Sequence, residues 1–180
     1  MKRILCLILT LAMVLPMLFT GAAAEEVLSV SDEAIRILKL EEGFSATPYW
    51  DYAQWTVGYG TKCPDDKLEE YRQNGISEEE AEALLRTYIA KFESEIHGFM
   101  IRTGVQLNQN QFDALVSFVF NVGTANYKKS TLRKKVLANP NDPAIADQFE
   151  RWVYAKGKVL LGLMKRRADE CELYFGKVME

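Results

Sequence analysis

Glu42-Gly43-Phe44-Ser45-Ala46-Thr47-Pro48-Tyr49-Trp50-Asp51-Tyr52-Ala53-Gln54-Trp55-Thr56-Val57-Gly58-Tyr59-Gly60 is the stretch on which the predicted fold and function of this 180-residue chain depend. It brings two carboxyl groups, at Glu42 and Asp51, and the hydroxyl of Thr56 into one short segment bounded by glycines. Such a segment can hold the end of a helix followed by a tight pair of strands.

A helix is predicted to end where this stretch begins. Ser31, followed by two acids, is typical of a helix start, apolar residues recur at helical spacing over 34–38, and Gly43 is a typical stop. Glu42 would then lie in the last turn, where unpaired carbonyl groups disfavour an ionised carboxylate. A glutamate that stays protonated is a candidate general acid. Glu41 is the alternative, but helical rotation points only one of the two at the following segment, and the adjacent glycine favours Glu42.

A β-hairpin is predicted to follow. Residues 49–51 and 55–57 have strand character and flank the three-residue connection 52–54. In the second strand Thr56 would share a face with Gly58 and Gly60, so that its hydroxyl would look across an open notch beside Asp51. One acid, one carboxylate and one hydroxyl so placed could act on one bond and one water molecule, as glycoside hydrolysis requires.

This stretch resembles the active-site segment of phage-type lysozymes, glycoside hydrolase family 24, in its endolysin and autolysin branch. The resemblance rests on Glu42-Gly43, on the Tyr-x-Asp ending at Asp51 and on Trp-Thr-Val-Gly-Tyr-Gly at 55–60, and it continues in residues 107–123 and 162–170. It covers residues 30–176. It implies that Glu42 protonates the glycosidic oxygen and that Asp51, with Thr56, holds the attacking water.

Two features depart from the family pattern. Four residues separate Asp51 from Thr56, whereas relatives commonly have five, which shortens the reach of Thr56. Thr61 stands where many relatives have a histidine, so any contact made by that histidine is not carried over.

Residues 1–24 are predicted to be a secretory signal peptide. They combine a basic start at Lys2 and Arg3, an apolar run over 4–19 and small residues ahead of a cleavage site between Ala24 and Glu25. The cleaved protein would be secreted, and the alternative is an uncleaved anchor that tethers it to the membrane, although the run is short for a spanning helix. The net charge of −3 becomes more negative once the signal is lost, and an acidic protein is not suited to nucleic acid.

The remaining residues, 25–180, are predicted to form one lysozyme domain of the α+β class, mostly α, with a small antiparallel sheet. By resemblance it has an N-terminal lobe at about 30–76, a connecting helix at about 77–98 and a helical C-terminal lobe at about 99–176. A capping box at 77–80 opens the connecting helix and Gly98 is expected to end it. Further helices are expected to begin at Asn108, Ser130 and Pro143, and the last to span about 163–175.

Cys63 and Cys171 remain after removal of the signal, which contains Cys6. In an exported protein they can form a disulfide, which would stabilise the fold by ~4 kcal/mol in the chain-entropy estimate. Two separate buried thiols are the alternative, because sequence does not show whether the sulfurs meet.

Several other side chains have two interpretations. His97 is the only histidine, which excludes a serine triad or a histidine metal site, and it is expected on the surface near a helix end. Aromatic residues could stack on sugars or belong to the core, namely Trp50, Trp55, Tyr59 and Trp152. Basic residues could bind anionic wall polymers or pair with carboxylates, namely Arg133, Lys134, Lys135, Lys165, Arg166 and Arg167.

The predicted function is hydrolysis of the β-1,4 bond between N-acetylmuramic acid and N-acetylglucosamine in bacterial peptidoglycan, by a monomer that needs neither metal nor cofactor. The resemblance implies inversion at the anomeric carbon. A lytic transglycosylase, which needs only the glutamate, and a wall-binding module that has lost turnover are the alternatives.

Overall fold

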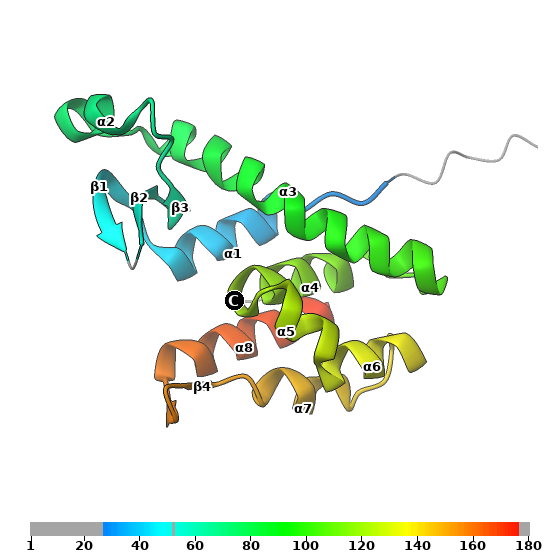
Figure 1. The fold of residues 1–180 in the computed structure, drawn as a ribbon. Coiled ribbons are helices and arrows are strands. Elements are labelled where there is room, and N and C mark those ends of the chain that lie inside the picture. Colours follow the sequence, from blue (N-terminus) through cyan, green and yellow to red (C-terminus); the bar gives the residue numbers. More distant parts are fainter. Residues whose placement is uncertain (1–26, 52, 177–180) are drawn as a thin grey trace, which may run out of the picture.

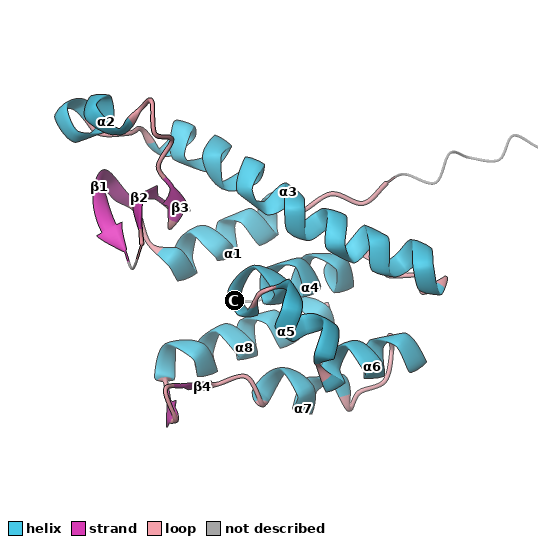
Figure 2. Ribbon diagram, in the orientation of Figure 1, coloured by secondary structure: helices cyan, strands magenta, loops and turns pink. Residues whose placement is uncertain are grey.

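The computed structural model describes residues 27–51 and 53–176, and it has the expected α+β, mostly helical architecture with a small antiparallel sheet (Figures 1 and 2). The predicted signal peptide and Tyr52 lie outside the described residues. In chain order the elements are α1 (Asp32–Glu42), β1 (Ser45–Asp51), β2 (Gln54–Gly58), β3 (Thr61–Lys62), α2 (Leu68–Asn74), α3 (Glu78–Thr103), α4 (Gln109–Val122), α5 (Thr124–Lys129), α6 (Thr131–Ala138), α7 (Ile145–Glu150), β4 (Tyr154–Ala155), β5 (Lys158–Val159) and α8 (Leu161–Tyr174).

Helix α1 has the predicted bounds because both of its caps are local. The Ser31 hydroxyl accepts a hydrogen bond from the backbone N–H of Ala34, and two acids occupy the first turn. Gly43 ends the helix with a positive φ of 70°, and its N–H donates to the carbonyl of Lys39. Glu42 is therefore the last helical residue, as predicted.

The sheet has the order β1-β2-β3, and its register differs from the prediction by one residue. Asp51 pairs with Gln54, so the β1–β2 connection has two residues and not three. Tyr49 pairs with Thr56, and Trp50 pairs with Trp55. Since side chains alternate between the faces of a strand, Tyr49, Asp51 and Thr56 share one face of the hairpin.

Helix α3 is longer than predicted. The expectation that it ends at Gly98 was wrong, because the helix continues to Thr103 and ends at Gly104, which has the left-handed φ of 73°. Gly98 has no positive φ and continues the helix, and the flexible end of the Arg102 side chain lies over it, with Nη1 2.7 Å from where a Cβ would stand. The glycine lets the Arg102 side chain fold back over the helix.

The C-terminal helices pack around α4. Asn108 and Gln111 form a reciprocal capping box at its start, and the next nine helical positions after Asn110 are buried. Helix α8 lies against α4 and α7, and Phe118 meets both Phe149 and Trp152 edge to face. Helix α6 begins after Ser130 as expected, whereas α7 begins after Ala144 and not at Pro143, because Ile145 and Ala146 donate to the carbonyls three residues back, at Asp142 and Pro143, in a tighter turn.

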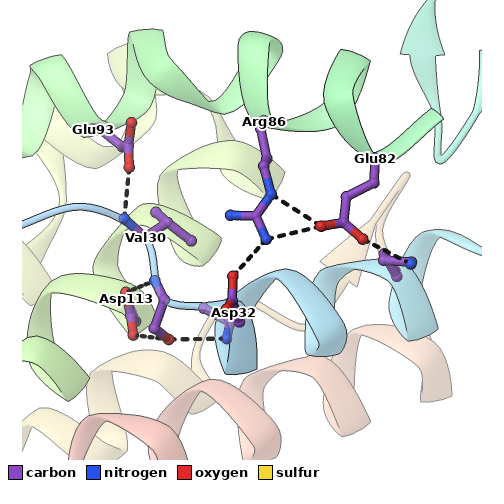
Figure 3. A network of polar contacts seen from close by, with 9 residues as sticks. Val30, Asp32, Glu82, Arg86, Glu93 and Asp113 are labelled. Atoms are coloured by element: carbon purple, nitrogen blue, oxygen red, sulfur yellow. Dashed lines mark hydrogen bonds and ion pairs between the residues drawn. The ribbon is translucent and has the colours of Figure 1, made fainter. Parts of the chain in front are cut away.

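A polar network ties the start of α1 to α3 and α4 (Figure 3). The buried Asp113 carboxylate on α4 accepts from the backbone N–H and the hydroxyl of Ser31, at 3.1 and 2.6 Å. Glu93 on α3 accepts from the backbone N–H of Val30 at 2.6 Å, and Arg86 joins Glu82 to Asp32. The helix that carries Glu42 is thus fixed at its opposite end.

The Cys63–Cys171 disulfide is not formed in this structure. Cys63 is a buried thiol that donates to the carbonyl oxygen of Pro64, and burial raises its pKa. Cys171 belongs to α8 and lines a cavity with Pro143 and Phe175. None of the helices in residues 27–51 and 53–176 has the length and apolar character needed to span a bilayer.

Candidate active site

Glu42 ends α1 with its carboxyl group held on two sides. Oε1 accepts a hydrogen bond from Nη1 of Arg166 on α8 at 2.6 Å. Oε2 lies against the backbone of Gly60, where an added Cβ would come within 3.2 Å of it. The side chain is 23% exposed whereas that of Arg166 is 6% exposed, so a ligand can reach the carboxyl while its cationic partner stays buried. The sequence analysis expected only unpaired helix-end carbonyl groups beside this carboxyl, whereas the structure adds a cationic partner from α8.

Tyr49 and Asp51 lie on the same face of the hairpin. Burial raises the pKa of the Tyr49 phenol, and the negative charges of Asp51 and Glu42 add to that effect. A shared influence on one phenol places both carboxyl groups within electrostatic range of Tyr49. Tyr49 is itself 43% exposed, so it belongs to the accessible surface of the site.

Thr56 does not look across an open notch, and this part of the prediction was wrong. The residue is only 2% exposed, and its hydroxyl has no hydrogen-bond partner among the described residues. The expected bare strip is filled at Gly58, where a Cβ would lie 2.7 Å from the Cβ of Ala81 on α3. Thr56 faces the same side as Asp51 and lies beside Tyr49, its cross-strand partner. Thr61, in the place of the family's histidine, donates to the Val57 carbonyl and closes the glycine turn.

Arg166 and Arg167 are buried and pair with carboxylates, which decides between their two interpretations. Glu170 Oε1 accepts from Arg167 Nη2 at 2.8 Å, from Ser117 Oγ at 2.9 Å and from Arg166 Nε at 3.4 Å. Burial raises the pKa of Glu170 and lowers the pKa of Arg167, while their mutual attraction acts in the opposite direction on each. The two arginines are therefore internal partners of acids.

Glu41, the alternative candidate for the general acid, forms an ion pair with Lys165. The Lys165 ammonium donates to Glu41 Oε1 and to Asp169 Oδ2, both at 2.6 Å, and these two partners raise the pKa of Lys165 to about 12. Two adjacent cations of α8, Lys165 and Arg166, thus form ion pairs with two adjacent acids of α1, Glu41 and Glu42. Of the other basic residues, Arg133 packs on Phe99, Lys135 pairs with Asp142 and Lys134 is exposed.

His97 is not a surface residue near a helix end. It lies half-buried within α3, its Nε2 is 2.7 Å from the carbonyl oxygen of Leu28, and its ring stacks on Phe112. The described residues contain no group of three or more His, Cys, Asp or Glu side chains arranged to hold a metal ion. Among the aromatic residues, Tyr59 is core, Trp55 and Trp152 are half-buried, and Trp50 is exposed beside Asp51.

A sheet and a helix end that present two acids, set against a helical lobe, define a protein of the lysozyme class. Comparison with known proteins agrees with this class. The family model described as Phage lysozyme matches residues 39–170, which include all three predicted catalytic residues. The chain belongs to the phage lysozyme family.

Individual relatives support the same assignment. The chain is 37% identical over 152 residues to an endolysin of Bacillus phage B103, with 82% of this chain and 54% of that protein covered. It is 36% identical over 134 residues to a SAR-endolysin of Enterobacteria phage PA-2, covering 73% and 76%. An endolysin structure from Escherichia coli O157:H7 phage FAHEc1 superposes with a TM-score of 0.71 at 30% identity, covering 85% and 97%. This chain spans about half the length of the B103 endolysin.

Tyr49 and Arg166 are the site residues whose roles the sequence analysis missed. The signal for Tyr49 was present in the Tyr-x-Asp motif, but its relation to Thr56 depends on strand register. Arg166 gave only the ambiguous signal of a basic run, because its partner is 124 residues away in the sequence.

Proposed function

We propose that this protein is a lysozyme that hydrolyses the β-1,4 bond between N-acetylmuramic acid and N-acetylglucosamine in bacterial peptidoglycan. The observation that carries the proposal is the placement of Glu42, which ends α1 with its carboxyl between Arg166 and Gly60 and shares the neighbour Tyr49 with Asp51. Family membership supports it, since the relatives compared are endolysins. The domain would extend over residues 25–180, with α3 connecting its two lobes.

Glu42 is the general acid in this mechanism. Its protonated form gives its proton to the glycosidic oxygen as the bond breaks, and Asp51 acts as the base that orients and deprotonates the attacking water. Attack from the side opposite the leaving group inverts the anomeric carbon, which requires carboxyl groups about 6.5–9.5 Å apart to leave room for water. The hydroxyl of Thr56 would complete the water site if the residues that bury it move aside when the glycan binds.

The burial of Thr56 favours a second candidate function. A lytic transglycosylase needs the acid but no bound water, because a hydroxyl of the sugar itself attacks. A Thr56 hydroxyl that is covered in this structure supports that alternative. The two functions differ in their products, since hydrolysis yields reducing muramic acid ends and the transglycosylase yields anhydro-muropeptides.

We also propose that the protein is exported and acts as a monomer on the wall. The basic, apolar and small-residue pattern of residues 1–24 supports cleavage after Ala24, and the relationship to a SAR-endolysin supports export, with a retained anchor as the alternative. N-terminal sequencing of the protein recovered from culture medium and from membranes distinguishes a start at Glu25 from a start at Met1.

A peptidoglycan zymogram tests the enzyme class directly. Wild type is expected to clear the gel, while Glu42→Gln and Asp51→Asn leave it opaque although circular dichroism shows both to be folded. Mass spectrometry of the wild-type products then separates hydrolysis from transglycosylation. Pelleting of the protein with intact walls, without clearing by wild type, would contradict an enzyme and identify a wall-binding module.

A further inference from the structure

Arg166 is shared between two acids, and one of them lies outside the proposed reaction centre. Its Nη1 donates to Glu42 at 2.6 Å, while its Nε faces Glu170 at 3.4 Å, a long contact. Among the described residues, Nη2 of Arg166 and Oε2 of Glu170 have no hydrogen-bond partner, and both atoms are buried. One guanidinium thus serves a reactive acid at one end and a buried acid at the other.

We propose that Glu170 is a positioning residue that acts on Glu42 through Arg166. By competing for the guanidinium, Glu170 limits how strongly Arg166 holds Glu42 as a carboxylate, and it thereby extends toward higher pH the range in which Glu42 can deliver a proton. This inference rests on the proposed function, because it takes Glu42 to be the general acid.

The competition requires that Glu170 is ionised, and its surroundings support that state. All three of its neighbours, Ser117, Arg166 and Arg167, approach as hydrogen-bond donors. Burial raises the pKa of Glu170, and the donors on Oε1 act against that shift. The ionised form satisfies the donors, and the two guanidinium groups offset part of the cost of burying its charge.

The direction of the effect follows from the charges. A general acid works in its protonated form, so a neighbouring guanidinium that favours the carboxylate ends activity at a lower pH. A second carboxylate beside the same guanidinium weakens that influence. Removal of Glu170 should therefore shift the alkaline limb of the pH–activity profile downward, whereas removal of Arg166 should shift it upward.

Other charged groups surround the pair and stay constant in the comparison. Near Glu42 lie Tyr49 of β1, which Asp51 also influences, and Glu41, which is paired with Lys165 of α8. Glu170 is faced by Arg167 from its own helix and by the neutral Ser117 from α4. These groups set the absolute position of the alkaline limb but do not change the sign of either shift.

The test compares pH–activity profiles for the clearing of purified peptidoglycan. An opposite charge within a few ångströms shifts a titration by ~1–3 pH units, so Arg166→Gln should move the alkaline limb up by about one unit or more, and Glu170→Gln should move it down by about half a unit. Glu172→Gln removes the same charge from another part of α8, where Glu172 lines the cavity of Pro143 and Phe175, and should leave the limb in place. An unmoved limb in a folded Glu170→Gln protein overturns the inference.

A second variant covers the possibility that Glu170→Gln does not fold, since it leaves Arg167 buried without its acid. Arg167→Met replaces this cation, which packs on Phe118, with an apolar side chain. Arg166 is then the one guanidinium left in contact with Glu170 among the described residues. The alkaline limb of Arg167→Met should move up, and an unmoved or lowered limb contradicts the competition. Carbon-13 NMR titration of the Glu42 carboxyl, assigned by its loss in Glu42→Gln, gives the same comparison without activity.

Failure of the inference is distinguishable from failure of the proposed function. If Glu42→Gln keeps wild-type activity, Glu42 is not the acid and the proposed function fails. If Glu42→Gln is inactive while the limbs of the Glu170 and Arg167 variants coincide with wild type, Glu170 is only a structural partner of Arg167.

Discussion

Gly60→Ala is predicted to reduce turnover by displacing the Glu42 carboxyl. Gly60 has a φ of 71°, which costs an L-residue ~1–2 kcal/mol, and its new Cβ would lie 3.2 Å from Oε2 of Glu42. The carboxyl cannot simply withdraw, because Arg166 holds its other oxygen at 2.6 Å. Since a misplacement of about 1 Å can cost 10²-fold in rate, a shift of a few tenths of an ångström should reduce turnover by about tenfold.

Gly104→Ala is the matched control for Gly60→Ala. Gly104 has a φ of 73° at the end of α3, and an added Cβ there meets nothing within 4 Å. Both variants should lose ~1–2 kcal/mol of unfolding free energy, or a few degrees in melting temperature, in urea and thermal scans. Only Gly60→Ala should lose initial rate in a peptidoglycan turbidity assay. Equal rates for the two folded variants would refute the claim that Gly60 leaves space for the acid.

Three further perturbations test other parts of the structure. Tyr49→Phe keeps the ring beside Thr56 but removes the phenol near both carboxyl groups, and it should lower kcat by about tenfold at unchanged melting temperature. An unchanged kcat would exclude a role for the phenol. Asp113→Ala leaves the donors of Ser31 and Gln109 without their buried acceptor, and urea unfolding should show a loss of ~2–4 kcal/mol, whereas a loss below ~1 kcal/mol would mean that α1 is not anchored there. Hydrogen bonds from Lys39 and Arg86 lower the pKa of Glu82, so its stabilisation is present above the ordinary glutamate pKa and lost as pH falls through the lowered value. Glu82→Gln should therefore cost ~0.5–1 kcal/mol at pH 7 and nothing once the pH falls below the lowered pKa, and a difference that persists in stronger acid would refute the ion-pair origin.

Local signals in the sequence predicted the parts of the site that depend on neighbouring residues. The caps at Ser31 and Gly43 fixed the position of Glu42 at the end of α1, since each acts within one turn. The same reasoning placed Asn108 and Ser130 at the starts of α4 and α6. The fold class was predicted because residues 42–60 resemble the active-site segment of the family.

Features that depend on distant partners could not be predicted in this way. Gly98 and Gly104 look alike in the sequence, and only the structure shows that Gly98 continues the helix while Gly104, with its left-handed φ of 73°, ends it. Thr56 was expected in an open notch, but Ala81 from α3 fills that space. Arg166 belonged to a basic run with two interpretations, and its contact with Glu42 exists only because α8 folds back to the end of α1.

The pair Glu42→Gln and Glu41→Gln tests the central claim most directly. Both changes remove one charge from neighbouring residues at the end of α1, but only Glu42 is proposed to give a proton to the glycosidic oxygen. General acid catalysis contributes roughly 10²–10⁴-fold, so the initial rate of peptidoglycan clearing should fall by at least about 10²-fold for Glu42→Gln and stay within about a factor of three of wild type for Glu41→Gln. Equal rates for the two folded variants, or a larger loss for Glu41→Gln, would contradict the assignment of the acid.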